Sequence, residues 1–132
     1  MSLTVSADLL AAAQTGQLDE DAFLACVRDS LPYAYDLVGE LADGLPAAQQ
    51  IGRSFVDNQV APDDAAQGQL LRAMASTSIR AALERHFGVR IAFQNCHRVA
   101  VFPVGADTSN AYREFVSPRA QVLNQSPELV NC

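Results

Sequence analysis

The segment 93–98, with the sequence Phe-Gln-Asn-Cys-His-Arg, carries the densest set of chemically capable side chains in this chain. His97 is a candidate general acid or base, because a free imidazole titrates at about pH 6.5. Arg98 and Asn95 are candidate hydrogen-bond donors to a carboxylate or to a developing oxyanion. We therefore predict that His97, Arg98 and Asn95 are catalytic and that Gln94 binds substrate.

Each of these residues also has a structural interpretation. His97 and Asn95 suit a surface turn, and Arg98 suits a solvated strand edge. Cys96 lies beside His97, but adjacent residues on a strand point to opposite faces, so a thiol–imidazole pair does not form by default. A thiol redox sensor built on Cys96 is therefore the weaker alternative.

A second polar group lies in the segment 46–62, where prolines and a glycine predict irregular structure. Long loops within compact domains are often functional. Arg53, Asp57 and Asn58 are accordingly predicted as further substrate-binding residues.

The polar segment is expected to lie at the tip of a β-hairpin over residues 89–103. Val89, Ile91 and Phe93 alternate with other residues before it, and Val99 and Val101 continue the apolar face after it. The intervening residues, among them Ala92 and Gln94, should form a polar face. An isolated hairpin is marginally stable, so it must pack on a helix or pair with another chain.

Helices should precede the hairpin. Ser6 is suited to cap a helix over 7–14, and Asp19 is suited to cap a second helix that breaks or kinks at Ser30 and Pro32. Cys26 is expected to be a small core residue of the second helix. A third helical stretch should close at Gly44 and Pro46. One long helix is predicted from about residue 63 to 86, ending at Gly88, and two short helical turns should follow Gly105.

Composition limits the class of protein. The chain has 132 residues and is 49% hydrophobic, which predicts one domain over residues 1–132, of the α+β class and mainly helical, with the antiparallel hairpin after the longest helix. A net charge of −6 argues against nucleic-acid binding. All nine basic residues are Arg, which excludes lysine-dependent pyridoxal-phosphate and Walker-A chemistry.

No cofactor and no metal site are expected, because the spacing of His and Cys matches no zinc motif. The three widely spaced cysteines and the absence of a targeting segment predict a cytoplasmic protein. No membrane association is expected, since the apolar runs are too short to span a bilayer.

Several segments together resemble a family of small actinobacterial proteins. They are 7–13 (ADLLAAA), 31–35 (LPYAY), 85–90 (RHFGVR), 93–102 (FQNCHRVAVF) and 123–129 (LNQSPEL). This group is similar to the lysinoalanine-forming proteins of cinnamycin and duramycin lanthipeptide biosynthesis, which make an antibiotic peptide crosslink. The resemblance implies a cofactor-independent enzyme that adds a lysine amine of a peptide substrate to dehydroalanine.

In that reaction the predicted catalytic residues would stabilise the enolate-like charge and move a proton. The alternative function is a non-catalytic binding or regulatory protein. A homodimer is predicted in either case, because the hairpin edges need to be covered.

Overall fold

The computed structural model describes residues 2–94 and 98–123. The described chain is mainly helical with a small antiparallel sheet, which confirms the predicted α+β class. In chain order the elements are α1 (Ala7–Gln14), α2 (Glu20–Ser30), α3 (Pro32–Gln50), β1 (Val56–Asp57), α4 (Asp64–Met74), α5 (Thr77–Phe87), β2 (Val89–Gln94), β3 (Arg98–Pro103), the 3₁₀ helix η1 (Ala106–Thr108), α6 (Asn110–Phe115) and α7 (Pro118–Leu123).

The predicted hairpin is present as β2 and β3, which pair antiparallel from Val89 opposite Pro103 to Gln94 opposite Arg98. The sheet also has a third strand, which we did not predict. β1 pairs with β3 through Val56 opposite Val101, so the strand order is β1-β3-β2. The segment 46–62 is therefore partly ordered by pairing with a strand that lies more than 40 positions later.

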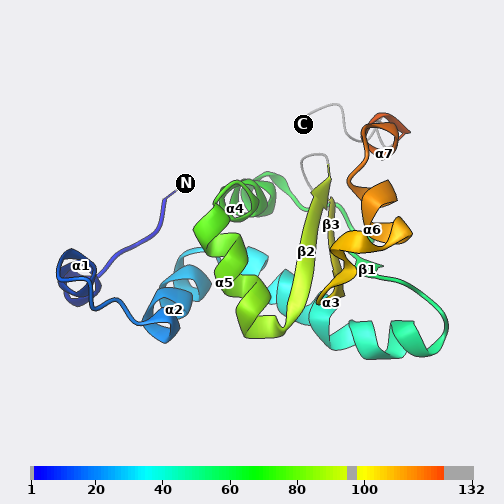
Figure 1. Ribbon diagram of the computed structural model, residues 1–132. Coiled ribbons are helices and arrows are strands. Elements are labelled where there is room, and N and C mark those ends of the chain that lie inside the picture. Colours follow the sequence, from blue (N-terminus) through cyan, green and yellow to red (C-terminus); the bar gives the residue numbers. More distant parts are fainter. Residues whose placement is uncertain (1, 95–97, 124–132) are drawn as a thin grey trace.

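Helices cover both faces of the sheet (Figure 1). One face packs with α3, α4 and α5 into the main core, whose fully buried members include Leu31, Val38, Leu70, Ile79 and Leu83. The other face forms a second cluster of Ala92, Ala100, Phe102 and Phe115. The expectation of a polar face on β2 was thus wrong, because Phe115 of α6 and the segment around Phe55 exclude water from it.

Side-chain caps define the helix starts. Ser6 and Asp19 cap α1 and α2 as predicted. Ser76 caps a further helix, since its Oγ accepts from the N–H of Ile79. The single long helix that we expected before the hairpin is therefore two helices, α4 and α5, joined at Ala75 and Ser76.

Helix α3 continues through Gly44 and Pro46, where we expected it to end. A proline removes one helical hydrogen bond, but Leu45 and Ala48 extend the buried face of the helix by another turn. Earlier in α3, Gly39 packs so closely that a Cβ at this position would lie 3.1 Å from Cε1 of Phe87. Tertiary packing therefore decides both the length of α3 and its close approach to Phe87.

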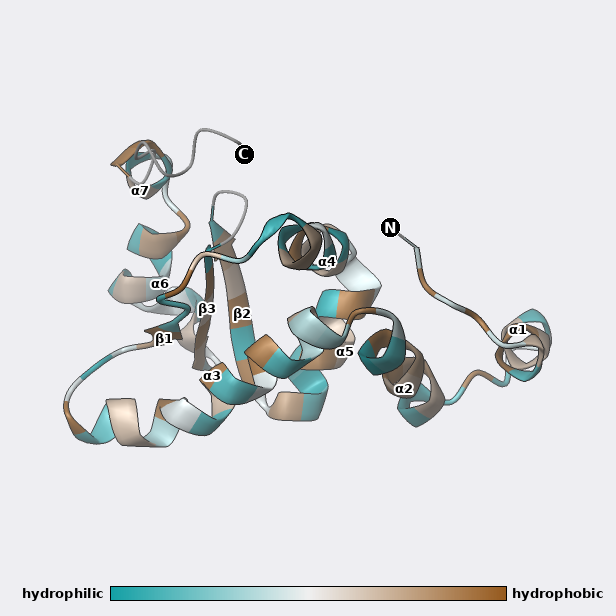
Figure 2. Ribbon diagram, turned by 180° about the vertical axis from the view of Figure 1, so that it is seen from behind, coloured by the Kyte–Doolittle hydropathy of each residue, from teal (hydrophilic) through white to brown (hydrophobic). Residues whose placement is uncertain are grey.

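Helix α1 lies at the edge of the molecule, beyond α2 (Figure 1). Its eight residues include no buried one, in contrast to α2 to α5. Figure 2 shows that α1 carries both hydrophobic and hydrophilic residues and is set apart from the other described helices. Across residues 2–94 and 98–123, no helix combines the length and apolarity needed to cross a membrane.

Candidate functional site

The hairpin brings two predicted site residues to the base of its tip. Gln94 ends β2 and Arg98 begins β3, and the two lie opposite each other in the register. The predicted catalytic residues Asn95 and His97, together with Cys96, lie outside the described residues. The described part of the predicted site is thus the polar cluster at the base of the hairpin tip.

Arg98 is held by an ion pair with Asp57 of β1. Its Nη2 lies 2.7 Å from Oδ2 of Asp57, and its Nε donates to the same oxygen at 2.8 Å. Its Nη1 donates to Oε1 of Gln94 at 3.2 Å. The Asp57 carboxylate is buried, at 6% exposed, whereas the Arg98 side chain is 30% exposed. Arg98 and Asp57 therefore neutralise each other, and Arg98 also joins Gln94 to the pair by a hydrogen bond.

The amide residues complete this cluster. Oδ1 of Asn58 accepts from the N–H of Val99 at 2.9 Å, so its side chain extends the pairing of β1 with β3. Nε2 of Gln59 donates to the second carboxylate oxygen of Asp57 at 2.8 Å. Asp57 and Asn58 were predicted separately from Arg98, and the short strand β1 brings them together. Sequence analysis did not predict this contact because β1, the strand that creates it, is only two residues long.

Aromatic packing fixes the outer side of the cluster. The guanidinium carbon of Arg98 lies 5.2 Å from the ring centroid of Phe115, within the range of a cation–π contact. Nε2 of Gln94 donates to the carbonyl of Phe115 at 2.7 Å. Gln94 is therefore satisfied although it is buried, and it anchors α6 to the sheet.

Arg53 does not join this cluster. It is exposed, and its backbone N–H donates to the carbonyl of Ala48 at 2.9 Å, which closes the end of α3. Among the residues that the structure describes, its side chain forms no ion pair. The structure thus separates Arg53 from Asp57 and Asn58, with which we had grouped it.

Two hollows flank the cluster. One, of about 340 Å³, lies over Phe55, Gln94, Arg98 and Phe115. The other, of about 470 Å³, is acidic: its lining includes Tyr33, Glu40, Asp57, Asn58 and Asp63. Burial, followed by the charges of Asp63 and Glu40, raises the pKa of Tyr33 above its usual value of 10.0. These surroundings disfavour the phenolate form of Tyr33.

Within the described part of the chain, no three His, Cys, Asp or Glu side chains gather where they could hold a metal ion. The other histidine, His86, lies in the last turn of α5, where its Nε2 is 3.0 Å from the hydroxyl of Tyr35. Cys26 is buried, as predicted, and its Sγ donates to the carbonyl of Thr4 at 3.3 Å.

The free edge of β2 is partly protected, which sequence reasoning missed. Oε2 of Glu84 accepts from the N–H of Ile91 at 2.9 Å, and it also lies 3.4 Å from Nη1 of Arg90. Arg90 pairs in addition with Asp107 at 3.2 Å. A carboxylate bound to an edge N–H opposes strand addition by another chain. Our reason for expecting a homodimer at the hairpin is therefore weakened at this position, and the dimer stays a prediction.

Comparison with known proteins corrects the resemblance drawn from the sequence. Residues 1–132 match the model of a protein family labelled KH NucS shadow and described as "NucS shadow ORF". The search of curated proteins found no match, and neither did the search of solved structures. The assignment to a lysinoalanine-forming group, and with it to lanthipeptide and antibiotic biosynthesis, was wrong, because the matching family is a different one. Since the match extends over all 132 residues, the chain belongs to the NucS shadow ORF family.

Proposed function

We propose that this protein is a non-catalytic binding module whose partner is another protein. The observation that carries the proposal is the saturation of the polar cluster. Arg98, Asp57 and Gln94 use their charges and hydrogen bonds on one another and on the backbone of α6. A catalytic group needs free capacity to act on a substrate, whereas these groups hold three strands and a helix together.

The topology supports a binding role. From β1 onward the elements follow the order β1-α4-α5-β2-β3-α6, a βααββα order like that of KH modules, and the label of the matching family carries the same two letters. KH modules grip a nucleotide backbone with a GxxG loop between two helices. Here that position holds Ala75 and Ser76, and the sequence contains no GxxG. The feature that suits such a fold to nucleic acid is therefore missing.

The net charge of the chain also argues against a nucleic-acid partner. A net charge of −6 repels a polyphosphate backbone and favours a neutral or cationic partner. The three widely spaced cysteines support a cytoplasmic location for this module, where thiols stay reduced.

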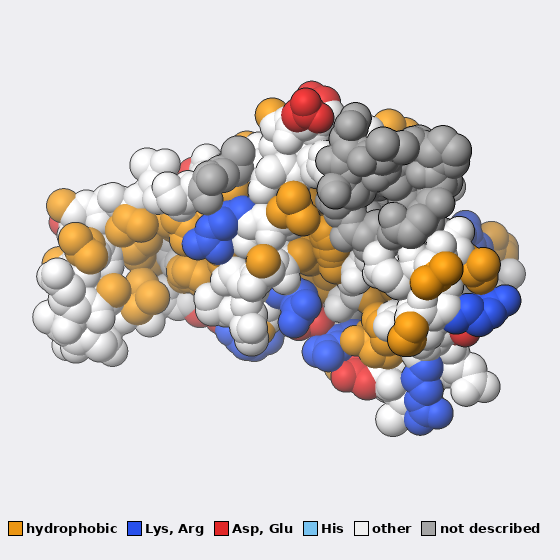
Figure 3. Space-filling model, turned by 90° about the horizontal axis from the view of Figure 1, so that it is seen from above, with side chains coloured by type: hydrophobic (Ala, Val, Ile, Leu, Met, Phe, Trp, Pro, Cys, Tyr) orange, Lys and Arg blue, Asp and Glu red, His pale blue; other side chains and the backbone are white. Residues whose placement is uncertain are grey.

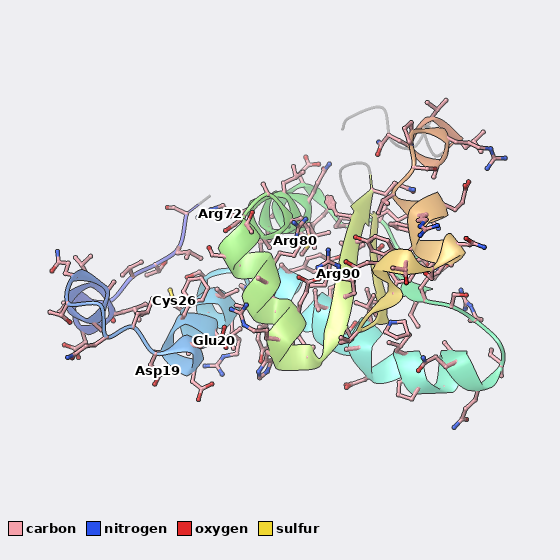
Figure 4. All side chains as sticks on the ribbon, viewed as in Figure 1. Asp19, Glu20, Cys26, Arg72, Arg80 and Arg90 are labelled. Carbon is pink, nitrogen blue, oxygen red and sulfur yellow. The ribbon has the colours of Figure 1, made fainter. Side chains whose placement is uncertain are left out.

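Single-stranded nucleic acid is the second candidate partner, and one observation favours it. Arg72 and Arg80 come from α4 and α5, on either side of the turn between these helices (Figure 4). Within the described ranges neither side chain forms an ion pair. Two such guanidinium groups beside a helix–helix turn could meet phosphates.

Two measurements on the full chain test the proposal. Fluorescence anisotropy with labelled single-stranded RNA and DNA should give dissociation constants no tighter than about 10⁻⁴ M at about 0.15 M salt, the weak end of non-specific binding. Panning a displayed library of helical peptides on the folded protein should enrich binders that do not bind the urea-unfolded chain.

The opposite pattern would overturn the proposal. Saturable oligonucleotide binding that is lost in the double variant Arg72→Glu, Arg80→Glu would make the protein a nucleic-acid module. A matched double variant on exposed arginines away from this turn, Arg53→Glu with Arg113→Glu, controls for the change in net charge. If no peptide is enriched on the folded protein relative to a surface without protein, the proposed protein-binding role is refuted.

A further inference from the structure

Helix α1 is short and largely exposed. It has eight residues, six of them Ala or Leu, and none is buried. Val5, which precedes the helix, is 50% exposed. Isolated helices shorter than about 12 residues are marginal in water. The apolar side of α1 therefore has the properties of a surface that another element completes.

A groove lies between α1 and α2. It has a volume of about 630 Å³, and its apolar lining consists of Val5, Leu9, Ala12, Ala22, Ala25 and Cys26. Figure 3 shows hydrophobic side chains gathered over this end of the molecule. Because three of the lining residues are alanines, the backbone of an incoming helix could approach closely.

The structure anchors the groove at its base. The N–H of Thr4 donates to Oγ of Ser30 at 2.9 Å, and the carbonyl of Thr4 accepts from Sγ of Cys26. Figure 4 shows Cys26 on the side of α2 that faces this N-terminal segment. Leu3 packs against the main core. The segment before α1 is thus tied to α2, so that α1 forms one wall of the groove rather than a loose end.

The charges around the groove have one sign. Asp8, Asp19 and Asp29 line it, and no Arg or His does. In residues 2–30 there are five acidic residues and one basic residue, Arg28, which gives a net charge of −4. Arg28 and Asp29 are paired with each other at 3.2 Å, which leaves Asp8 and Asp19 as the rim carboxylates that form no ion pair among the described residues. An apolar floor with an acidic rim complements a ligand that is apolar on one side and cationic at its flanks.

We propose that the groove between α1 and α2 binds a cationic amphipathic helix of a partner protein. The inference rests on the proposed protein-binding function and names its site and its partner class. The apolar side chains of the bound helix enter between α1 and α2, and its Arg or Lys residues pair with the aspartates at the rim. Burial of the apolar side of α1 supplies the cover that this helix lacks.

A second copy of this chain fits the groove less well. The helix that it would insert, α1, carries Asp8 and no basic residue, so the dimer would place carboxylates from both copies around one groove. Like charges brought together at an interface disfavour the wrong partner. The charge pattern thus selects a cationic helix over self-association.

The test uses the full chain and three synthetic helical peptides of about 15 residues, a length that supports a helix. The first has Leu at i, i+3, i+4 and i+7 with Arg elsewhere, the second replaces Arg by Glu, and the third scrambles the first. Isothermal calorimetry should show binding of the Arg peptide about tenfold or more tighter than either of the others, weakening as salt is raised.

Matched variants locate the site. Ala22→Arg places a long cationic side chain in the groove and should weaken binding by about tenfold or more. Ala13→Arg on the exposed side of α1, outside the lining, should bind like the unmodified protein. Removal of two rim charges by Asp8→Asn with Asp19→Asn should weaken binding, and Asn keeps the cap of α2. Asp36→Asn with Asp43→Asn on α3 should not weaken it. Circular dichroism of each variant verifies that it is folded.

The outcomes separate this inference from the function on which it rests. Equal binding by Ala22→Arg and Ala13→Arg, or no preference for the Arg peptide, overturns the groove proposal even if library peptides bind elsewhere. A concentration-dependent dimer that Ala22→Arg abolishes assigns the groove to a second copy and likewise overturns it. If no peptide of any kind binds, both the inference and the proposed function fall.

Discussion

Replacing Arg98 by Met tests whether the polar cluster stabilises the fold. The substitution keeps much of the side-chain volume but leaves the Asp57 carboxylate buried without its cationic partner. Breaking a fully buried ion pair from one side costs about 3–5 kcal/mol. Two features lower this value here: the Arg98 side chain is 30% exposed, and Asp57 keeps the hydrogen bond from Gln59. We expect the free energy of unfolding to fall by about 2–3 kcal/mol.

The reverse substitution, Asp57→Asn, should cost less. Arg98 can reach water once its partner is neutral, and the amide introduced by the substitution can still accept a hydrogen bond, so the expected loss is about 1 kcal/mol. In the double variant the two losses should not add, and a coupling energy of about 1–2 kcal/mol should appear. The coupling measures the pair itself and not the two side chains separately.

Urea unfolding followed by far-ultraviolet circular dichroism is the suitable assay, since the chain has no Trp for fluorescence. Arg53→Met is the matched control: Arg53 is exposed and forms no ion pair with any described residue, so its loss should change stability by less than about 0.5 kcal/mol. A loss for Arg98→Met that is no larger than this control would refute the reasoning. Arg98 would then be free for chemistry, and the main support for a non-catalytic function would be lost.

Three further predictions concern local features, and a fourth concerns the oligomeric state. Gly44→Ala should stabilise α3 by about 0.5–1 kcal/mol in urea unfolding. Gly39→Ala should lose that gain because the new Cβ meets the ring of Phe87. Equal effects of the two substitutions would contradict the close approach of Gly39 to Phe87. Ser76→Ala should lower stability by about 1 kcal/mol through loss of the α5 cap, and an unchanged urea midpoint would show that the cap is not formed. The folded chain binds the Tyr33 proton more tightly than the unfolded chain, so this contribution to stability is full below pH 10.0 and is lost as the pH rises through the folded pKa. Tyr33→Phe should therefore reduce the fall in the urea midpoint above pH 10.0. An identical fall in both proteins would argue against this contribution. Light scattering should give twice the 14.1 kDa monomer mass if the homodimer predicted from the hairpin forms, and a constant monomer mass at micromolar concentration would exclude it.

Local signals in the sequence were sufficient where the interaction itself is local. The caps at Ser6 and Asp19 and the start and end of the hairpin depend on neighbours within a few residues, and the structure has them where they were predicted. The same signals misled at Pro46 and Ser76. The proline suggested an end to α3, but buried residues beyond it offset the lost hydrogen bond. At Ser76 the apolar periodicity continued across a break that only the cap reveals.

The candidate site shows the same division. The residue types at Gln94, Arg98 and Asp57 could be recognised as polar and capable of binding, because charge and hydrogen-bonding capacity belong to each side chain. That these side chains meet could not be predicted from the sequence, since their contact depends on a two-residue strand that forms only against β3. A strand this short has no periodicity to detect and gains its hydrogen bonds from a partner 40 or more positions away.

Composition and short-range pattern were enough to establish the helical α+β class, the hairpin, the negative charge and the absence of lysine chemistry. Three features could be recognised only in the folded chain: the ion pair between Arg98 and Asp57, the cover on both faces of the sheet, and the groove beside α1 with its apolar floor and acidic rim. These features depend on which distant surfaces meet and on how much water their contact excludes, and no local pattern carries that information.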